Sequence, residues 1–193
     1  LPNELISFLS NVMKRIFGNH IVLITLVYLV FVFFLQYFNG WFQDFSDAIY
    51  YLWIADKYIE KDWQNAINTY WGPMISWLLV FFKPIIAEPF VRFRVIQLLL
   101  GLTSLLLINS ILKKKQIESK NSLCYTLICL PLVVSFAWFY LTPDLLLVTG
   151  LLIAIRFFLS EKEVHFWQII FAALIGSMLF FIKSIGLYFF ILI

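Results

Sequence analysis

The sequence predicts an all-α membrane protein: a polytopic transmembrane helical bundle with interfacial amphipathic helices in the first outer loop. Two observations lead to this fold class. Of the 193 residues, 63% are hydrophobic and only 13% are charged, whereas soluble domains carry about 25% charged residues. Several apolar runs also reach the roughly 18 residues that a helix needs to cross a bilayer. A soluble domain is therefore excluded, and a net charge of +3 gives no reason to expect a nucleic-acid partner.

The apolar segments alternate with short polar turns, and this pattern sets the expected topology. Lys14 and Arg15 precede the first segment, so the positive-inside rule places the N-terminus in the cytoplasm. The lysine-rich loop 113–120 then also lies in the cytoplasm, and the long loop 39–94 lies outside. The predicted spans are residues 20–38, 95–112, 123–141, 145–159, 166–182 and 185–193.

The two ends of the chain suggest a fragment. The sequence does not begin with Met, and it ends within the last apolar segment. We therefore expect residues 1–193 to be the N-terminal part of a single transmembrane domain whose sixth span is cut off.

The first outer loop contains the largest polar stretch, with five of the eleven acidic residues between positions 39 and 73. Apolar residues recur there at three- and four-residue steps from Ala48 to Ile59, which is typical of one helix face. We interpret residues 47–62 as an amphipathic helix in the membrane interface, with its apolar face down. The apolar segment 74–82 is too short to span, which predicts a re-entrant or interfacial helix on the same side.

This topology brings charged residues from distant segments to the outer face: Asp44, Asp47, Arg92, Asp144 and Lys183. Ionisable side chains at the ends of apolar spans are costly, which makes them candidates for a functional role. Carboxylates beside cations suit proton removal from one substrate and binding of an anionic head group of another. Structural roles compete with these functions. Asp47 and Asp144 can be helix-start acids. Arg92 and Arg94 can snorkel to the interface, and Lys183 can pair with an acid or a lipid phosphate.

Several of these segments resemble the GT-C membrane glycosyltransferases, which include the protein mannosyltransferases and the lipid A aminoarabinose transferases. The first span, the outer loop and then DAIYYLWIADKY are similar to the start of that family. WGPMISWLLVFFK resembles its Pro-led juxtamembrane segment, and the stretch from Glu88 to Arg92 resembles the place where an Arg opens the next span. TPDLL resembles a later turn, and FIK resembles the segment before another span.

The resemblance implies that a sugar moves from a polyprenyl-phosphate donor to an acceptor on the outer face, with inversion of the anomeric centre. Asp47 would be the general base, and Lys183 and Arg92 would bind the donor phosphate. The family often has paired acids where this chain has Ser46-Asp47, with Asp44 three residues earlier, so Asp44 is the alternative base.

Further expectations follow for the site and its surroundings. Asp144 and Tyr51 are additional site candidates, and we expect no cofactor and no metal, because cationic side chains can stabilise a monophosphate leaving group. The partners would be the lipid-linked donor, membrane lipids and an acceptor that the sequence leaves open: a lipid, a glycan or a protein. Abundant Phe, Ile, Lys and Asn beside scarce Ala are typical of an AT-rich bacterial genome, so we expect a multi-pass protein of the bacterial inner membrane.

Two other classes of function compete with an enzyme. A membrane transporter or lipid flippase would place ionisable residues and broken helices near the midplane, often with internal repeats. In this chain the charges gather at one face, and no internal repeat is evident. A non-catalytic membrane scaffold would need no convergence of carboxylates and cations.

Overall fold

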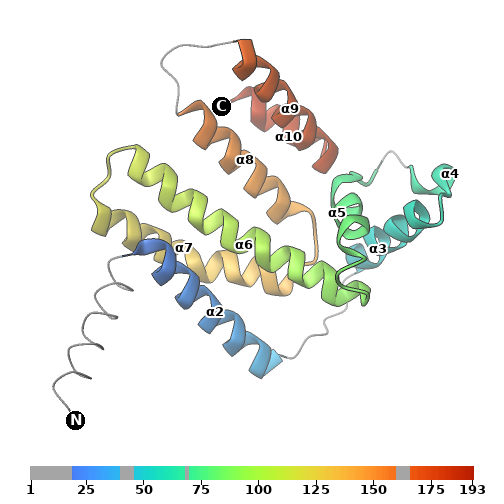
Figure 1. Ribbon diagram of the computed structural model, residues 1–193, viewed down its shortest axis with the longest axis horizontal. Coiled ribbons are helices and arrows are strands. Elements are labelled where there is room, and N and C mark those ends of the chain that lie inside the picture. The colour runs from blue at the N-terminus through green and yellow to red at the C-terminus, as the bar shows by residue number, and fades with distance from the viewer. Residues whose placement is uncertain (1–18, 40–45, 68–69, 160–165) are drawn as a thin grey trace.

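The computed structural model describes residues 19–39, 46–67, 70–159 and 166–193, and all regular structure in these ranges is helical (Figure 1). The predicted all-α fold is confirmed for this part of the chain. The helices are α2 (His20–Asn39), α3 (Ser46–Ile59), α4 (Trp63–Ala66), α5 (Met74–Phe82), α6 (Pro89–Lys114), α7 (Ser119–Phe139), α8 (Asp144–Phe158), α9 (Phe166–Ile182) and α10 (Ile185–Ile191).

Three of these helices are long and apolar enough to cross a membrane: His20–Phe38 of α2, and the whole of α6 and α7. The other three predicted spans are helical but shorter. They are α8 with 15 residues, α9 with 17 and α10 with 7. By length and composition, the structure therefore supports a membrane protein with three candidate spans in its described part.

Helix α6 is the centre of the bundle, and α2, α7 and α8 pack along it (Figure 1). Side-chain hydroxyls form hydrogen bonds between these helices in a mainly apolar interior. The Tyr28 hydroxyl of α2 donates to the Leu98 carbonyl of α6 at 2.7 Å. Ser104 of α6 and Thr149 of α8 share a buried hydrogen bond of 2.8 Å. Such bonds let polar side chains occupy the interior without leaving unpaired groups.

Helix α6 begins at Pro89, earlier than the predicted start of the second span at residue 95. The Glu88 side chain accepts a hydrogen bond from the Val91 amide, and Pro is favourable in the first turn because it has no N–H to satisfy there. Arg92 and Arg94 therefore lie inside the helix, and each is only 2% exposed. The interpretation of these two arginines as snorkelling interfacial side chains is thus wrong.

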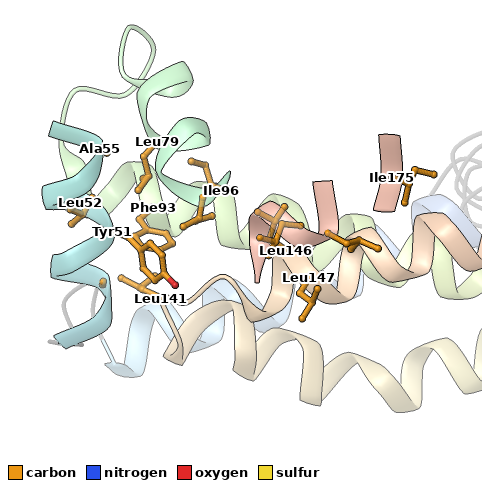
Figure 2. Packing of buried hydrophobic residues seen from close by; sticks show 14 of the residues in the cluster. Tyr51, Leu52, Ala55, Leu79, Phe93, Ile96, Leu141, Leu146, Leu147 and Ile175 are labelled. Carbon is orange, nitrogen blue, oxygen red and sulfur yellow. The ribbon is translucent and has the colours of Figure 1, made fainter. Parts of the chain in front are cut away.

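The apolar face of α3 is covered by protein. Ala48, Tyr51, Leu52 and Ala55 are buried in one cluster with residues of α5 and the start of α6. Figure 2 shows the α3 side chains beside Leu79 and Phe93. The expectation that this face points down into the membrane interface is therefore wrong, because α5 and α6 occupy that side.

The predicted helix 47–62 ends three residues early, and a separate short helix begins just after its predicted end. Helix α3 ends at Ile59, and Lys61 follows in the left-handed conformation with φ of 61°. Asp62 then caps the short helix α4 by accepting a hydrogen bond from the Asn65 amide at 3.4 Å. A left-handed residue just after a helix is a common way to end it, since the chain must turn away there.

Candidate functional site

One end of the bundle holds a cavity of about 660 Å³. Helices α3–α5, the turn before α8 and the turn between α9 and α10 meet at this end (Figure 1). Aromatic and other apolar side chains form much of the wall, and the lining residues with a charged group or a hydroxyl are Asp47, Tyr51, Tyr70, Thr142, Lys183 and Ser184. Three site residues predicted from distant parts of the sequence, Asp47, Tyr51 and Lys183, therefore line one cavity.

A fourth predicted residue, Asp144, is bound to the cavity lysine. The Lys183 ammonium lies 2.5 Å from Asp144 Oδ1, and the Thr142 hydroxyl donates to Asp144 Oδ2 at 2.9 Å. Asp144 is in the first turn of α8, where the helix dipole favours a negative charge. An ammonium group has three donors, so Lys183 can bind an anion in the cavity while it keeps its bond to Asp144.

Asp47 occupies the first turn of α3 and is partly buried. No ion pair or side-chain hydrogen bond holds its carboxylate within the described residues. An ionised carboxylate can only accept hydrogen bonds. Asp47 therefore offers an acceptor to whatever occupies the cavity.

Tyr51 follows Asp47 by one helical turn, so both side chains lie on the same face of α3. Its ring is packed edge-on against Trp71, with 5.0 Å between centroids, and against Phe93, with 6.4 Å. Burial raises the pKa of Tyr51, and the negative charges of Asp47 and Asp144 raise it further. Its hydroxyl consequently stays protonated at neutral pH and can donate a hydrogen bond.

Gly72 allows the α4–α5 connection to approach the end of α9. A Cβ atom at this position would lie 2.1 Å from the Ile182 carbonyl oxygen and 2.6 Å from that of Phe181. Only glycine fits against these two backbone groups. The close approach brings Trp71 and Pro73 into the cavity wall, and the Trp71 ring stacks on Tyr50 with 5.6 Å between centroids.

Arg92, which was expected at a donor phosphate, is not part of the cavity lining. Its guanidinium donates to the backbone carbonyls of Leu79, Ile86 and Ala87 at 3.0, 2.8 and 2.8 Å. These bonds satisfy carbonyls at the end of α5 and in the turn that follows. The structure thus gives Arg92 a structural role between α5 and α6 and does not bring it to Lys183.

The remaining expectations concern Asp44 and a metal. Asp44 lies outside the described residues. Within the described ranges, no three His, Cys, Asp or Glu side chains are grouped as a metal site requires.

Two polar residues near the cavity were not singled out from the sequence. Ser184 lines the cavity directly after Lys183. Gln97 is fully buried in α6, and its amide group donates to the Thr142 carbonyl. Gln97 interrupts an apolar run, and a polar residue inside such a run is itself a signal of a functional site. The position of Gln97 could be read from the sequence, whereas its hydrogen-bond partner, the Thr142 carbonyl, is known only from the fold.

Comparison of the chain with protein-family models, with curated proteins and with solved structures finds no match. The fold and the site define a general class: a helical bundle whose described part has three candidate membrane spans, and at one end a cavity with a largely apolar wall that also carries Asp47 and Lys183.

Proposed function

We propose that this protein is an integral membrane glycosyltransferase that moves a sugar from a polyprenyl-phosphate donor to an acceptor on the outer face of the membrane. The observation that carries the proposal is one cavity lined by a cation, Lys183, and by a carboxylate, Asp47, that pairs with none of the described residues. The resemblance of the same segments to the GT-C glycosyltransferases supports it.

The chemistry assigns one role to each of these two side chains. The acceptor hydroxyl or amine attacks the anomeric carbon, and Asp47 takes its proton. The bond between the anomeric carbon and the phosphate oxygen breaks, and its electron pair leaves with the lipid phosphate. Lys183 stabilises the charge on that leaving group with an ammonium that Asp144 already holds in place. Direct displacement inverts the anomeric centre.

An apolar groove beside the cavity suits the hydrocarbon chain of such a donor. It has a volume of about 390 Å³, lies between α9 and α10, and shares Phe180 and Phe181 with the cavity. The Ser177 hydroxyl in its wall donates to the Ala173 carbonyl at 2.8 Å, so this wall offers no free donor. A lipid phosphate bound at Lys183 would therefore have an apolar surface next to it.

The distribution of lysines supports an outer location for the cavity. Lys113, Lys114, Lys115 and Lys120 lie at the end of α6 and the start of α7, and Figure 1 shows that this is the end of the bundle opposite α3–α5. Clustered lysines favour the cytoplasmic side. The cavity at the other end of α6 then faces outward.

The decisive experiment is sugar transfer by purified protein in detergent, with a radiolabelled polyprenyl-phosphate sugar as the donor. Asp47→Asn should reduce turnover by about 10²–10⁴-fold, the usual contribution of a general base. Donor affinity should persist, because Asn keeps the size and the helix-capping ability of Asp. Lys183→Ala should instead weaken donor binding, which the assay measures as a higher KM for the donor. The control is Asp56→Asn, which changes an exposed acid on the same helix outside the cavity.

Near-normal turnover of Asp47→Asn would remove Asp47 as the base and leave Asp44 as the candidate. If Lys183→Ala has the wild-type KM for the donor, Lys183 does not bind the phosphate. If no polyprenyl-phosphate sugar is consumed by the wild-type protein with any acceptor class, the glycosyltransferase proposal fails.

A further inference from the structure

Gln97 is a buried amide in α6 that the proposed chemistry does not use. Its side chain is 0% exposed, and it sits within an apolar stretch of a candidate span. Burial of an amide without hydrogen bonds is costly. Its Oε1 atom has no hydrogen-bond partner among the described residues. Among the described residues, the side chain of Gln97 therefore makes its hydrogen bond through the amide nitrogen.

That nitrogen connects Gln97 to the cavity through one turn. Nε2 donates to the backbone carbonyl of Thr142. A carbonyl oxygen only accepts, so the amide must present its nitrogen at this contact. The Thr142 hydroxyl donates to Asp144 Oδ2 at 2.9 Å, and Asp144 Oδ1 accepts from the Lys183 ammonium at 2.5 Å. A line of hydrogen bonds thus runs from the interior of α6 to the cation of the cavity.

We propose that Gln97 is a positioning residue that sets the location of the Lys183 ammonium by holding the turn that carries Asp144. The Thr142 carbonyl accepts a hydrogen bond from Gln97, and the Thr142 hydroxyl donates one to Asp144. The orientation of this turn therefore determines where the Asp144 carboxylate points. Gln97 itself does not line the cavity, so we expect it to act through the turn and not by direct contact with a bound molecule. The effect on donor binding rests on the proposed function, whereas the effect on Lys183 does not.

The competing explanation for the hydrogen bond of Gln97 is that it stabilises the packing of α6 against α8 in general. Ser104 and Thr149 already fasten these two helices, through a buried hydrogen bond of 2.8 Å that lies deeper in the bundle. Thr149 also donates to the Leu145 carbonyl at 2.7 Å, so removal of the Ser104 hydroxyl leaves Thr149 satisfied. Ser104→Ala therefore loosens the same pair of helices without affecting the turn, which makes it a matched control.

The experiment compares Gln97→Met, which keeps the length of the side chain but has no donor, with Ser104→Ala, Asp144→Asn and the double variant Gln97→Met/Asp144→Asn. The first measurement is the rate at which an amine-directed acylating reagent modifies Lys183, followed by mass spectrometry and normalised to Lys115. Lys115 is exposed at the opposite end of α6. The second measurement is kcat and KM for a polyprenyl-phosphate sugar.

Gln97→Met should raise the relative modification rate of Lys183 several-fold and the donor KM by about tenfold, which is the upper range for one neutral hydrogen bond. The value of kcat should change less, and Ser104→Ala should change neither quantity. In the Asp144→Asn background, Gln97→Met should have no additional effect, because Gln97 acts only through Asp144.

The proposal is overturned if Gln97→Met behaves like Ser104→Ala, or if its effect on Lys183 is undiminished in the Asp144→Asn background. Should Gln97→Met fail to fold, Gln97→Asn keeps an amide that is one methylene too short for the Thr142 carbonyl. It should raise Lys183 modification in the same way, and a wild-type rate would overturn the proposal. Absence of sugar transfer in every protein, together with the expected modification rates, would refute the proposed function and leave the role of Gln97 standing.

Discussion

Replacement of Gly72 by Ala tests whether the close approach of the α4–α5 connection to α9 builds the cavity. The backbone of Gly72 is not in the left-handed region, so alanine is compatible with its conformation. On that ground alone the substitution would stabilise the protein by about 0.4–1 kcal/mol, by restricting the unfolded chain. The new Cβ, however, would lie 2.1 Å from the Ile182 carbonyl oxygen, whereas ordinary contacts begin at 3.4 Å.

The size of the effect follows from what the methyl group meets. Its nearest neighbours are backbone atoms, which cannot rotate away as a side chain can. Such overpacking costs about 1–3 kcal/mol, and the gain from the unfolded chain reduces this to a net loss of about 1–2 kcal/mol. For a chain of this size, that corresponds to a decrease in Tm of about 2–8 °C. The connection and α9 must also separate by roughly 1 Å, and a misplacement of this size can cost about 100-fold in rate.

The assays are thermal unfolding in detergent and sugar transfer, with Gly150→Ala as the control. A Cβ at Gly150 would meet the Leu179 Cδ2 atom at 2.6 Å, which is the movable end of a side chain. Alanine is also favoured over glycine inside a helix by about 1 kcal/mol. Gly150→Ala should therefore have an unchanged or slightly higher Tm. If Gly72→Ala and Gly150→Ala have the same Tm and the same turnover, the close approach at Gly72 does not shape the cavity.

Two further predictions concern residues outside the cavity. Arg92→Lys keeps the charge but loses the planar group that donates to three carbonyls. We expect the free energy of unfolding, measured by thermal unfolding, to fall by about 2–4 kcal/mol. Wild-type stability together with a raised donor KM would instead indicate that Arg92 binds the donor phosphate. The hydrogen bond from the Asn65 side chain lowers the pKa of Asp62, which caps α4. A lowered folded-state pKa contributes stability above the unfolded pKa, and this contribution is lost as the pH falls through the folded value. Amide exchange in α4 should therefore accelerate in acid, and the acceleration should disappear in Asp62→Asn; identical acid profiles for both proteins would contradict this role of the cap.

The positions of the helices follow from local properties of the sequence, because the length of an apolar run and the residues at its ends act over only a few positions. The predicted segment 166–182 has the same bounds as α9, and the predicted 20–38 differs from α2 by one residue. The gathering of Asp47, Asp144 and Lys183 could also be predicted, since successive helices that reverse direction return their ends to the same side of a bundle.

The surroundings of these helices were decided only by the tertiary structure. A periodic pattern shows that one face of α3 is apolar, but lipid and protein are both apolar partners, so the pattern does not distinguish them. The burial of Arg92 likewise depends on carbonyls of α5 and its following turn, which the fold brings within reach. The link between Gln97 and Thr142 joins residues 45 positions apart, and the space at Gly72 depends on the end of α9. Contacts of this kind arise from the packing of whole helices against one another, and no local pattern in the sequence encodes them.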